Sequence, residues 1–385
     1  MLCGCLADRL KQLVCVWFGS GVSGLSRLVT AAMATQTVTY RAASHAGSWY
    51  TANGPALARE LTQWLNATGI PRPGAAAAAG NGSAPACSVP DGRLRAIIAP
   101  HAGYAYSGPV AAYAYACIDP SAYDRVVVLG PSHHVYMPGC AVSTAATLRT
   151  PIGDLVTDDV AVAQLRATGL FSAFEPAADE AEHSIEMHLP YLAHVFGARR
   201  SAIRVTCVVV GSLSTEAEAT YGAAMAPLLL DSPRTLTVVS SDFCHWGRRF
   251  RYTRLGDPPP PAGLARHAAI EAMDREGMAL IERQDVPGWA AYLKRTGNTI
   301  CGRHPIGVLL RAVEAWQGGG AGQASDAATA GGTANGNELP VGRGTLRTRF
   351  LKYAQSSPVV SSADSSVSYA SGVTMLVEGN ASDDG

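Results

Sequence analysis

The chain has 385 residues, with 30 basic and 30 acidic side chains, and 48% of its residues are hydrophobic. The net charge of zero argues against a nucleic-acid-binding protein, which needs an excess of Lys and Arg on one face. No apolar run reaches the roughly 18 residues that a membrane-spanning helix requires, so we expect a soluble protein without a membrane span.

The two ends of the chain differ from the remainder. Residues 1–36 are basic and poor in acids, which is typical of a targeting peptide. A disordered extension, or a translation start placed too early, is the alternative that we favour, because Met33 lies just before the first regularly patterned segment. We expect residues 37–377 to form the folded part of the chain and residues 378–385 to form a disordered tail.

Short runs of β-branched and apolar residues predict strands at 94–99, 125–129, 203–210 and 235–240. Helical spacing of apolar residues predicts helices at 55–66, 158–167, 215–230, 264–283 and 305–316. Thr157, followed by two aspartates, is the expected cap of the second helix. Strands that alternate with helices predict a single α/β domain with a mostly parallel central sheet flanked by helices.

Two stretches interrupt this pattern. Residues 71–91 and 318–344 are rich in Gly, Ala and Ser. Such segments have little apolar surface to bury, so we expect both to be flexible, low-complexity insertions at the surface.

Polar side chains follow three of the predicted strands. His101 follows the first, His133 follows the second, and the segment from Asp242 to His245 follows the last. Ligands of open α/β sheets bind at the carboxyl ends of the strands, and imidazole, thiolate and carboxylate groups are common metal ligands. A metal site is therefore one interpretation, and hydrogen-bonded structural histidines are the other.

Two of the cysteines, Cys244 and Cys301, lie in polar segments that also carry a histidine. The nine cysteines of the chain are an odd number without C-x-x-C pairs, which favours reduced thiols. Cys301 lies before the predicted helix at 305–316, close to Arg303 and His304, and we expect this setting to lower the pKa of its thiol. Cys301 is thus a candidate ligand or reactive thiol, whereas Cys244 has the pattern of a packed residue. Simple burial is the alternative for both.

Two further segments carry candidate site residues. The segment EHSIEMH reads as a helical turn ending at Pro190, in which His183 and Glu186 share a face. Glu182 and Glu186 pair one turn apart, and these two carboxylates either support the histidines or transfer protons, unless they lie on a solvated turn. Arg248 and Arg249 form a basic patch for an acidic or phosphorylated peptide, unless they only stack on neighbouring rings.

The motifs resemble those of the Memo family, the mediators of ErbB2-driven cell motility. They occur in the family's order between residues 38 and 377, as SHAGSWY, IIAPHAGY, LGPSHH, EHSIEMHLPY, VVSSDFCHWG, TICGRHPIGVLL, YAQSS and DSSVSYA. The resemblance implies a fold like that of class III extradiol dioxygenases, whose iron is held by two histidines and a carboxylate. In the Memo pattern a cysteine replaces the carboxylate, and its thiolate is a softer ligand that favours Cu(I) and Zn.

Carried over by motif, the resemblance implies that His101, His133 and Cys301 bind iron or copper. It places His245, beside Asp242, where the dioxygenases have their general base. We expect His183, Glu186, Arg248, Arg249 and Trp49 to support these ligands or to bind a peptide.

The resemblance leaves three functions open. The first is an iron- or copper-binding protein in redox-linked signalling to the cytoskeleton and cell motility, in the cytoplasm, with a nuclear pool and N-terminal targeting left open. The second is a metal-independent adaptor whose partners are signalling proteins or phosphotyrosine peptides. The third is an active iron-dependent dioxygenase, and we rank the three in this order.

Overall fold

The computed structural model describes residues 39–72, 89–326 and 344–378, which belong to one compact unit, Val38–Gly385. The predicted N-terminal extension lies outside the described residues. The same holds for most of the two predicted insertions, at 71–91 and 318–344, and of the predicted tail at 378–385.

The described residues contain one large sheet. Its strands are β1 (Tyr40–Arg41), β2 (Arg93–Ala99), β3 (Arg125–Pro131), β4 (Cys140–Val142), β5 (Thr147–Leu148), β6 (Leu155–Thr157), β7 (Phe171–Ala173), β8 (Arg204–Val210), β9 (Thr235–Ser240), β10 (Asp242–Trp246), β11 (Thr345–Gln355) and β12 (Ser366–Val377). The order along the sheet is β1-β5-β6-β8-β3-β9-β2-β12-β10, with β11 paired to β12, and with β4 joining β7 to β8. The central run from β6 to β2 is parallel, whereas β12 is antiparallel to β2, β10 and β11.

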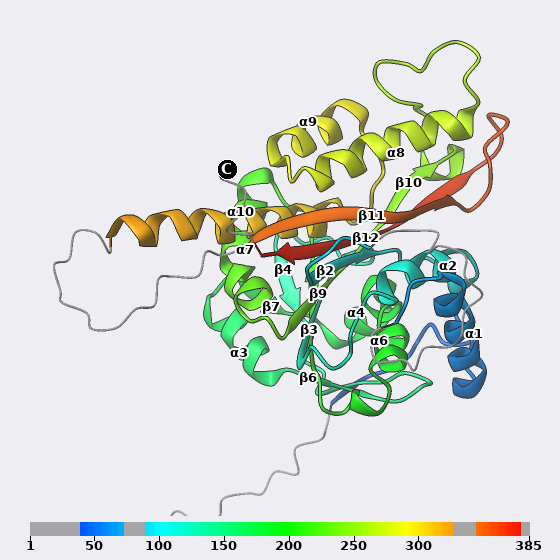
Figure 1. Ribbon diagram of the computed structural model, residues 1–385. Coiled ribbons are helices and arrows are strands. Elements are labelled where there is room, and N and C mark those ends of the chain that lie inside the picture. Colours follow the sequence, from blue (N-terminus) through cyan, green and yellow to red (C-terminus); the bar gives the residue numbers. More distant parts are fainter. Residues whose placement is uncertain (1–38, 73–88, 327–343, 379–385) are drawn as a thin grey trace, which may run out of the picture. The chain divides into compact units, whose positions relative to one another are not determined.

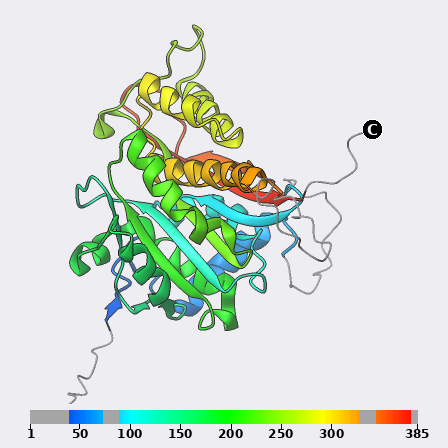
Figure 2. The same cartoon turned by 90° about the vertical axis from the view of Figure 1, so that its left-hand side faces the viewer.

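Helices cover both faces of this sheet. They are α1 (Gly54–Ala67), α2 (Tyr104–Tyr115), α3 (Asp159–Ala167), α4 (Pro176–Ala181), α5 (His183–Glu186), α6 (Leu189–Phe196), α7 (Thr215–Ala226), α8 (Arg266–Glu282), α9 (Val286–Thr296) and α10 (Arg303–Asp326). Helices α1, α2 and α6 lie together on one side of the parallel strands, and α7 packs against α10 on the other (Figures 1 and 2). The hairpin of β11 and β12 runs past α8 (Figure 1).

The central strands are buried on both faces. In β3, Val126 and Val128 pack into the core beneath α1, α2 and α6, while Val127 and Leu129 pack into the core beneath α7 and α10. Successive side chains of a strand point to opposite faces, so a strand covered on both sides needs an unbroken apolar run. The predicted α/β fold with a mostly parallel sheet flanked by helices is therefore confirmed.

Several element boundaries differ from the prediction. The helix expected at 215–230 ends as an α-helix at Ala226, because Pro227 has no N–H to donate, and a π-helical turn follows. The helix expected at 305–316 continues to Asp326, into the predicted insertion. Asp158, not Thr157, caps α3 by accepting from the Ala161 N–H. The EHSIEMH turn does not end at Pro190, because α6 begins at Leu189 and uses this proline in its first turn.

Among the residues that the structure describes, none of the helices combines the length and the apolar character needed to cross a bilayer.

Candidate metal centre

The predicted ligands come together at the carboxyl ends of β2, β3 and β9. These strands are neighbours in the order β3-β9-β2, so the residues that follow them meet at one edge of the sheet. His101 follows β2, His133 follows β3, and Asp242 begins β10 directly after β9. Cys301 reaches the same point from the segment before α10, with its Sγ 3.1 Å from His101 Nε2.

His101 is buried, and its tautomer follows from its hydrogen bonds. Its Nδ1 lies 2.6 Å from Ser240 Oγ, and the Ser240 hydroxyl donates to the Ser184 carbonyl at 2.7 Å. Because the hydroxyl proton is already used, His101 Nδ1 must donate, which leaves the lone pair of Nε2 facing Cys301. Burial, together with the neighbouring imidazoles, lowers the pKa of His101 well below its ordinary value. The ring is therefore neutral.

His133 is oriented by a buried carboxylate. Its Nδ1 lies 2.9 Å from Glu182 Oε1, and its backbone N–H donates to Glu182 Oε2 at 2.6 Å. Burial alone would raise the pKa of Glu182, but the hydrogen bonds from His133 and Ser184 outweigh it and lower this pKa to about 2. An ionised carboxylate only accepts, so His133 Nδ1 donates and Nε2 is left free. This is the carboxylate–histidine arrangement of many metal sites.

Within the described part of the chain, two sets of three residues have ligand atoms that all lie within 4.8 Å of one another. One set is His101, His133 and His183, and the other is His101, Asp242 and Cys301. The trio implied by the family resemblance is divided between these sets, with His101 belonging to both. Imidazoles, a thiol and a carboxylate are a donor mixture that suits iron, copper or zinc, so the residues present fit a bound metal.

The expectation of a lowered thiol pKa at Cys301 is wrong for the free thiol. Burial, and then the nearby carboxylate of Asp242, raise the pKa of Cys301 well above its ordinary value, and Arg303 opposes this only in part. The backbone N–H of Asp242 donates to Cys301 Sγ at 3.3 Å. Because a coordinating thiol is deprotonated outright by its metal ion, a cation here would overcome the effect of burial.

His245 lies on β10 and presents one ring nitrogen. Its Nδ1 is 2.9 Å from the Phe243 carbonyl and 3.1 Å from the Thr299 carbonyl, so this nitrogen donates and Nε2 carries the lone pair. Asp242 is buried and accepts from the His101 N–H at 2.9 Å, and burial raises its pKa. This arrangement would allow His245 to exchange a proton at Nε2.

Trp49 packs beside the cluster of imidazoles. The ring of His183 lies between Trp49 and His133, with centroid distances of 4.5 Å and 4.3 Å. Glu186 does not face this ring. It accepts from His45 Nδ1 at 2.9 Å and from the Tyr50 hydroxyl at 2.7 Å, and thus fixes the loop that carries Trp49.

The predicted basic patch is exposed near His245. Arg248 and Arg249 are both exposed, in the short turn after β10. The Arg249 guanidinium lies 4.4 Å above the ring of Phe250, whose edge in turn meets His245 at 5.2 Å. Arg249 therefore does stack on a neighbouring ring, as the alternative expected, while remaining exposed to solvent.

A buried carboxylate of α8 ties two parts of the site together. Asp274 accepts from Asn298 Nδ2 at 2.9 Å, from the Tyr353 hydroxyl at 2.9 Å and from the Cys244 N–H at 3.3 Å. Burial raises its pKa to about 6. Cys244 precedes His245, and Asn298 lies three residues before Cys301, so Asp274 links the two segments that carry these side chains.

The sequence interpretation missed Ser240 and Thr299, which hold His101 and His245, and it did not show that Glu182 faces His133. Ser240 and Thr299 are polar residues at strand or helix ends with no distinctive pattern, and the partner of Glu182 is 49 positions away.

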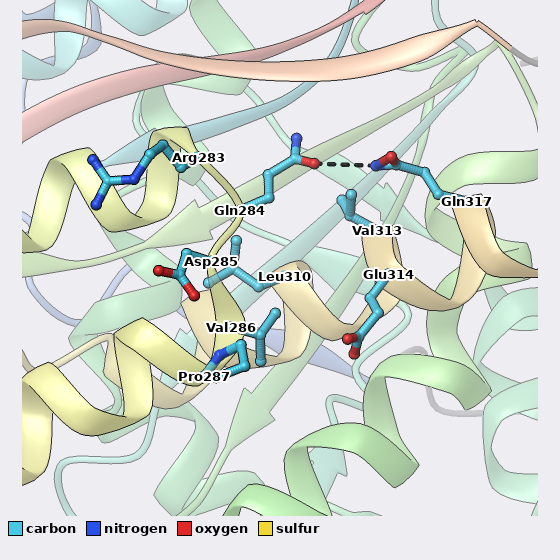
Figure 3. Close-up of a pocket in the computed structure, with 9 residues that line it drawn as sticks. All are labelled: Arg283, Gln284, Asp285, Val286, Pro287, Leu310, Val313, Glu314 and Gln317. Atoms are coloured by element: carbon cyan, nitrogen blue, oxygen red, sulfur yellow. Dashed lines mark hydrogen bonds between the residues drawn. The ribbon is translucent and has the colours of Figure 1, made fainter.

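The separate cavity in Figure 3, of about 390 Å³, lies between the α8–α9 turn and α10. None of the candidate ligands lines it, and its charged side chains, Arg283, Asp285 and Glu314, do not converge (Figure 3).

Comparison with known proteins agrees with the motifs. Residues 41–373 match the family described as Memo-like protein. Protein MEMO1 from Homo sapiens and from Xenopus laevis are each 42% identical to this chain, over 87% of this chain and 97% of theirs. The protein memo-1 homolog from Caenorhabditis elegans is 43% identical over 87% of this chain and 83% of its own.

A solved structure, that of the uncharacterized protein JW3007 from Escherichia coli K12, aligns with a TM-score of 0.35 at 10% identity, over 72% of this chain and 99% of that chain. This likeness is too distant to carry an argument about fold or function. The family match and the alignments with these relatives both extend over most of the described residues. The chain belongs to the Memo-like protein family.

Proposed function

We propose that this protein binds iron or copper through His101, His133 and Cys301 and acts in redox-linked signalling to the cytoskeleton and cell motility. The observation that carries the proposal is the 3.1 Å contact between Cys301 Sγ and His101 Nε2, two residues 200 positions apart. His133 presents a second Nε2 beside them, fixed by Glu182. Membership of the Memo-like family supports the signalling role.

Neighbouring side chains hold the proposed ligands in an orientation that suits a metal ion. Ser240 and Glu182 hold the two imidazoles in the tautomer that presents Nε2. Asp242 holds the backbone of His101, and its own N–H donates to the sulfur of Cys301. A bound iron or copper ion would supply one-electron redox chemistry. In this proposal His245, whose Nδ1 is held by two carbonyls, serves as the acid or base of that chemistry through Nε2.

The test is metal binding by protein purified without oxygen and loaded with Fe(II) or Cu(I). We expect His101→Ala and Cys301→Ser to weaken binding at least about 100-fold, since loss of even an outer-shell partner weakens metal binding about 10–100-fold. His194→Ala and Cys117→Ser, outside the site, are the matched controls. Metal content is read by elemental analysis. Unchanged metal content in both site variants would remove the basis of the proposal.

A second candidate function is a metal-independent adaptor for phosphotyrosine peptides. The exposure of Arg248 and Arg249 beside the site favours it. We expect a phosphotyrosine peptide to bind equally with and without a chelator, and each of Arg248→Ala and Arg249→Ala to weaken binding about 10-fold, as for a charge-assisted hydrogen bond. Arg166→Ala, an exposed arginine of α3, is the control. Peptide binding that is insensitive to both substitutions counts against this function.

A further inference from the structure

The loop between β10 and α8 contains four consecutive prolines, Pro258–Pro261. The ring of a proline fixes its φ at about −65°, and a following proline disfavours the helical ψ of the residue before it. Pro258, Pro259 and Pro260 are each followed by another proline, so both backbone angles favour a polyproline II helix. The cis bond of this loop, Asp257–Pro258, lies before the run, and the bonds between the four prolines are trans.

The proline run lies at the surface. Pro258, Pro259 and Pro261 are exposed, and Pro260 is half-buried. A polyproline II helix has three residues per turn, so Pro258 and Pro261 share one edge and Pro259 lies on the next. Within the described part of the chain, the carbonyls of the first three prolines accept no backbone hydrogen bond. Figures 1 and 2 both show this loop projecting from the rest of the described chain.

Both ends of the run are anchored. Before it, Leu255 packs against the core and Arg295 donates to the Asp257 carbonyl. After it, the Leu264 N–H donates to the Pro261 carbonyl at 3.2 Å, which closes a turn. An anchored segment that is already extended loses little conformational entropy when a partner binds it. The fold therefore presents the prolines in a form that a partner can bind directly.

The residues beside the run indicate the kind of partner. Domains that bind polyproline II helices do so in grooves lined by aromatic side chains. SH3 domains also bind a basic residue beside the prolines, and EVH1 domains bind a large apolar one. The neighbours here are Asp257 and Ala262, which are neither, and an acidic groove would repel Asp257. A WW domain, which holds the prolines themselves between aromatic rings, fits this run best.

We propose that Pro258–Pro261 is the binding segment for a partner protein that carries a WW-type groove. The rings of Pro258 and Pro261, one turn apart, and the ring of Pro259 enter the groove between its aromatic side chains. This inference does not rest on the proposed metal site, because the run contains none of its ligands. The alternative role of the run is to stiffen the connection between β10 and α8.

The experiment titrates a purified WW domain that accepts consecutive prolines into the full chain and, separately, into a synthetic peptide of residues 254–266. Calorimetry measures the affinity, and we expect both to bind. Pro259→Ala and Pro261→Ala should each weaken binding by the chain about 10-fold, as for the loss of two buried CH₂ groups. Pro233→Ala, which replaces an exposed single proline before β9, is the matched control. A chelator should leave the affinity unchanged.

An SH3 domain and an EVH1 domain are titrated in parallel. Binding to either of these but not to the WW domain would overturn the assignment of the partner. Binding by the peptide but not by the chain would show that the fold hides the run, against the proposal. No binding to any of the three domains, or full affinity in both Pro259→Ala and Pro261→Ala, would leave the run with a stiffening role only.

Discussion

Replacing Arg41 with methionine is expected to destabilise the fold by about 3–5 kcal/mol, the range for breaking a buried ion pair by removing one partner. The side chain of Arg41 is fully buried. Its Nε donates to Asp179 Oδ1 at 3.0 Å, and its Nη1 donates to Glu186 Oε2 at 2.9 Å. Methionine fills similar space but leaves both carboxylates buried without their cation.

The same guanidinium also holds the backbone of the segment that ends at Glu182. Arg41 Nη2 donates to the carbonyls of Asp179, at 2.7 Å, and Glu182, at 2.5 Å. These bonds join β1 to α4 and to the residue that orients His133. Loss of Arg41 therefore frees two carbonyls in addition to two charges, which places the expected effect at the upper end of the range.

Urea unfolding followed by circular dichroism measures this change. Arg275→Met, which breaks an exposed pair on α8, is the control and should change the free energy of unfolding by less than about 1 kcal/mol. Burial alone would raise the pKa of Glu186, but the hydrogen bond from His45 and the charge of Arg41 lower it to about 2. The stability that this carboxylate contributes is present above its unfolded pKa and is lost as pH falls toward 2. The difference between the variant and the original chain should narrow over that range, and a difference below about 1 kcal/mol at neutral pH contradicts the account.

The central strands could be predicted from the sequence because burial on both faces leaves a local signal. The strands expected at 94–99, 125–129, 203–210 and 235–240 match β2, β3, β8 and β9 to within two residues at either end. By contrast, α2 and β12 were not predicted. Helix α2 is buried over most of its surface and contains Gly108 and Pro109, so it has no apolar stripe. Strand β12 is buried through small and polar residues such as Ser368 and Ser371, which do not form an apolar run.

For the candidate site, too, some features could be predicted from the sequence and others could not. That His101, His133 and Asp242 follow strands is visible in the sequence, and parallel strands bring such residues together. The contacts that orient the histidines are not visible, because Ser240 is 139 positions from His101 and Glu182 is 49 positions from His133. The predicted direction of the pKa shift at Cys301 was wrong, and the reason is related. Nearby cations can be read from the sequence, but the depth of burial, which dominates here, depends on the whole fold.

The second large effect that we expect is on metal affinity. It follows from the contact between Glu182 and His133, which orients the His133 ring. Replacing Glu182 with glutamine should weaken binding of iron or copper about 10–100-fold, as measured for partners of metal-binding histidines elsewhere. The carboxylate of Glu182 accepts three N–H groups, from His133 N, His133 Nδ1 and Ser184 N. A glutamine amide has only one oxygen, so in either orientation its NH₂ group faces a donor. His133 must then turn, and its Nε2 loses the direction that the carboxylate imposes.

Glu180→Gln is the matched control for this variant. Glu180 lies two positions away and accepts from the Ala42 N–H at 3.1 Å, but it contacts none of the candidate ligands in the described part of the chain. Metal affinity is measured by competition with a chelator, and the fold of each variant is checked by circular dichroism. A folded Glu182→Gln protein that binds metal within about 2-fold of the original would show that His133 needs no such partner, against the rule for metal-bound imidazoles.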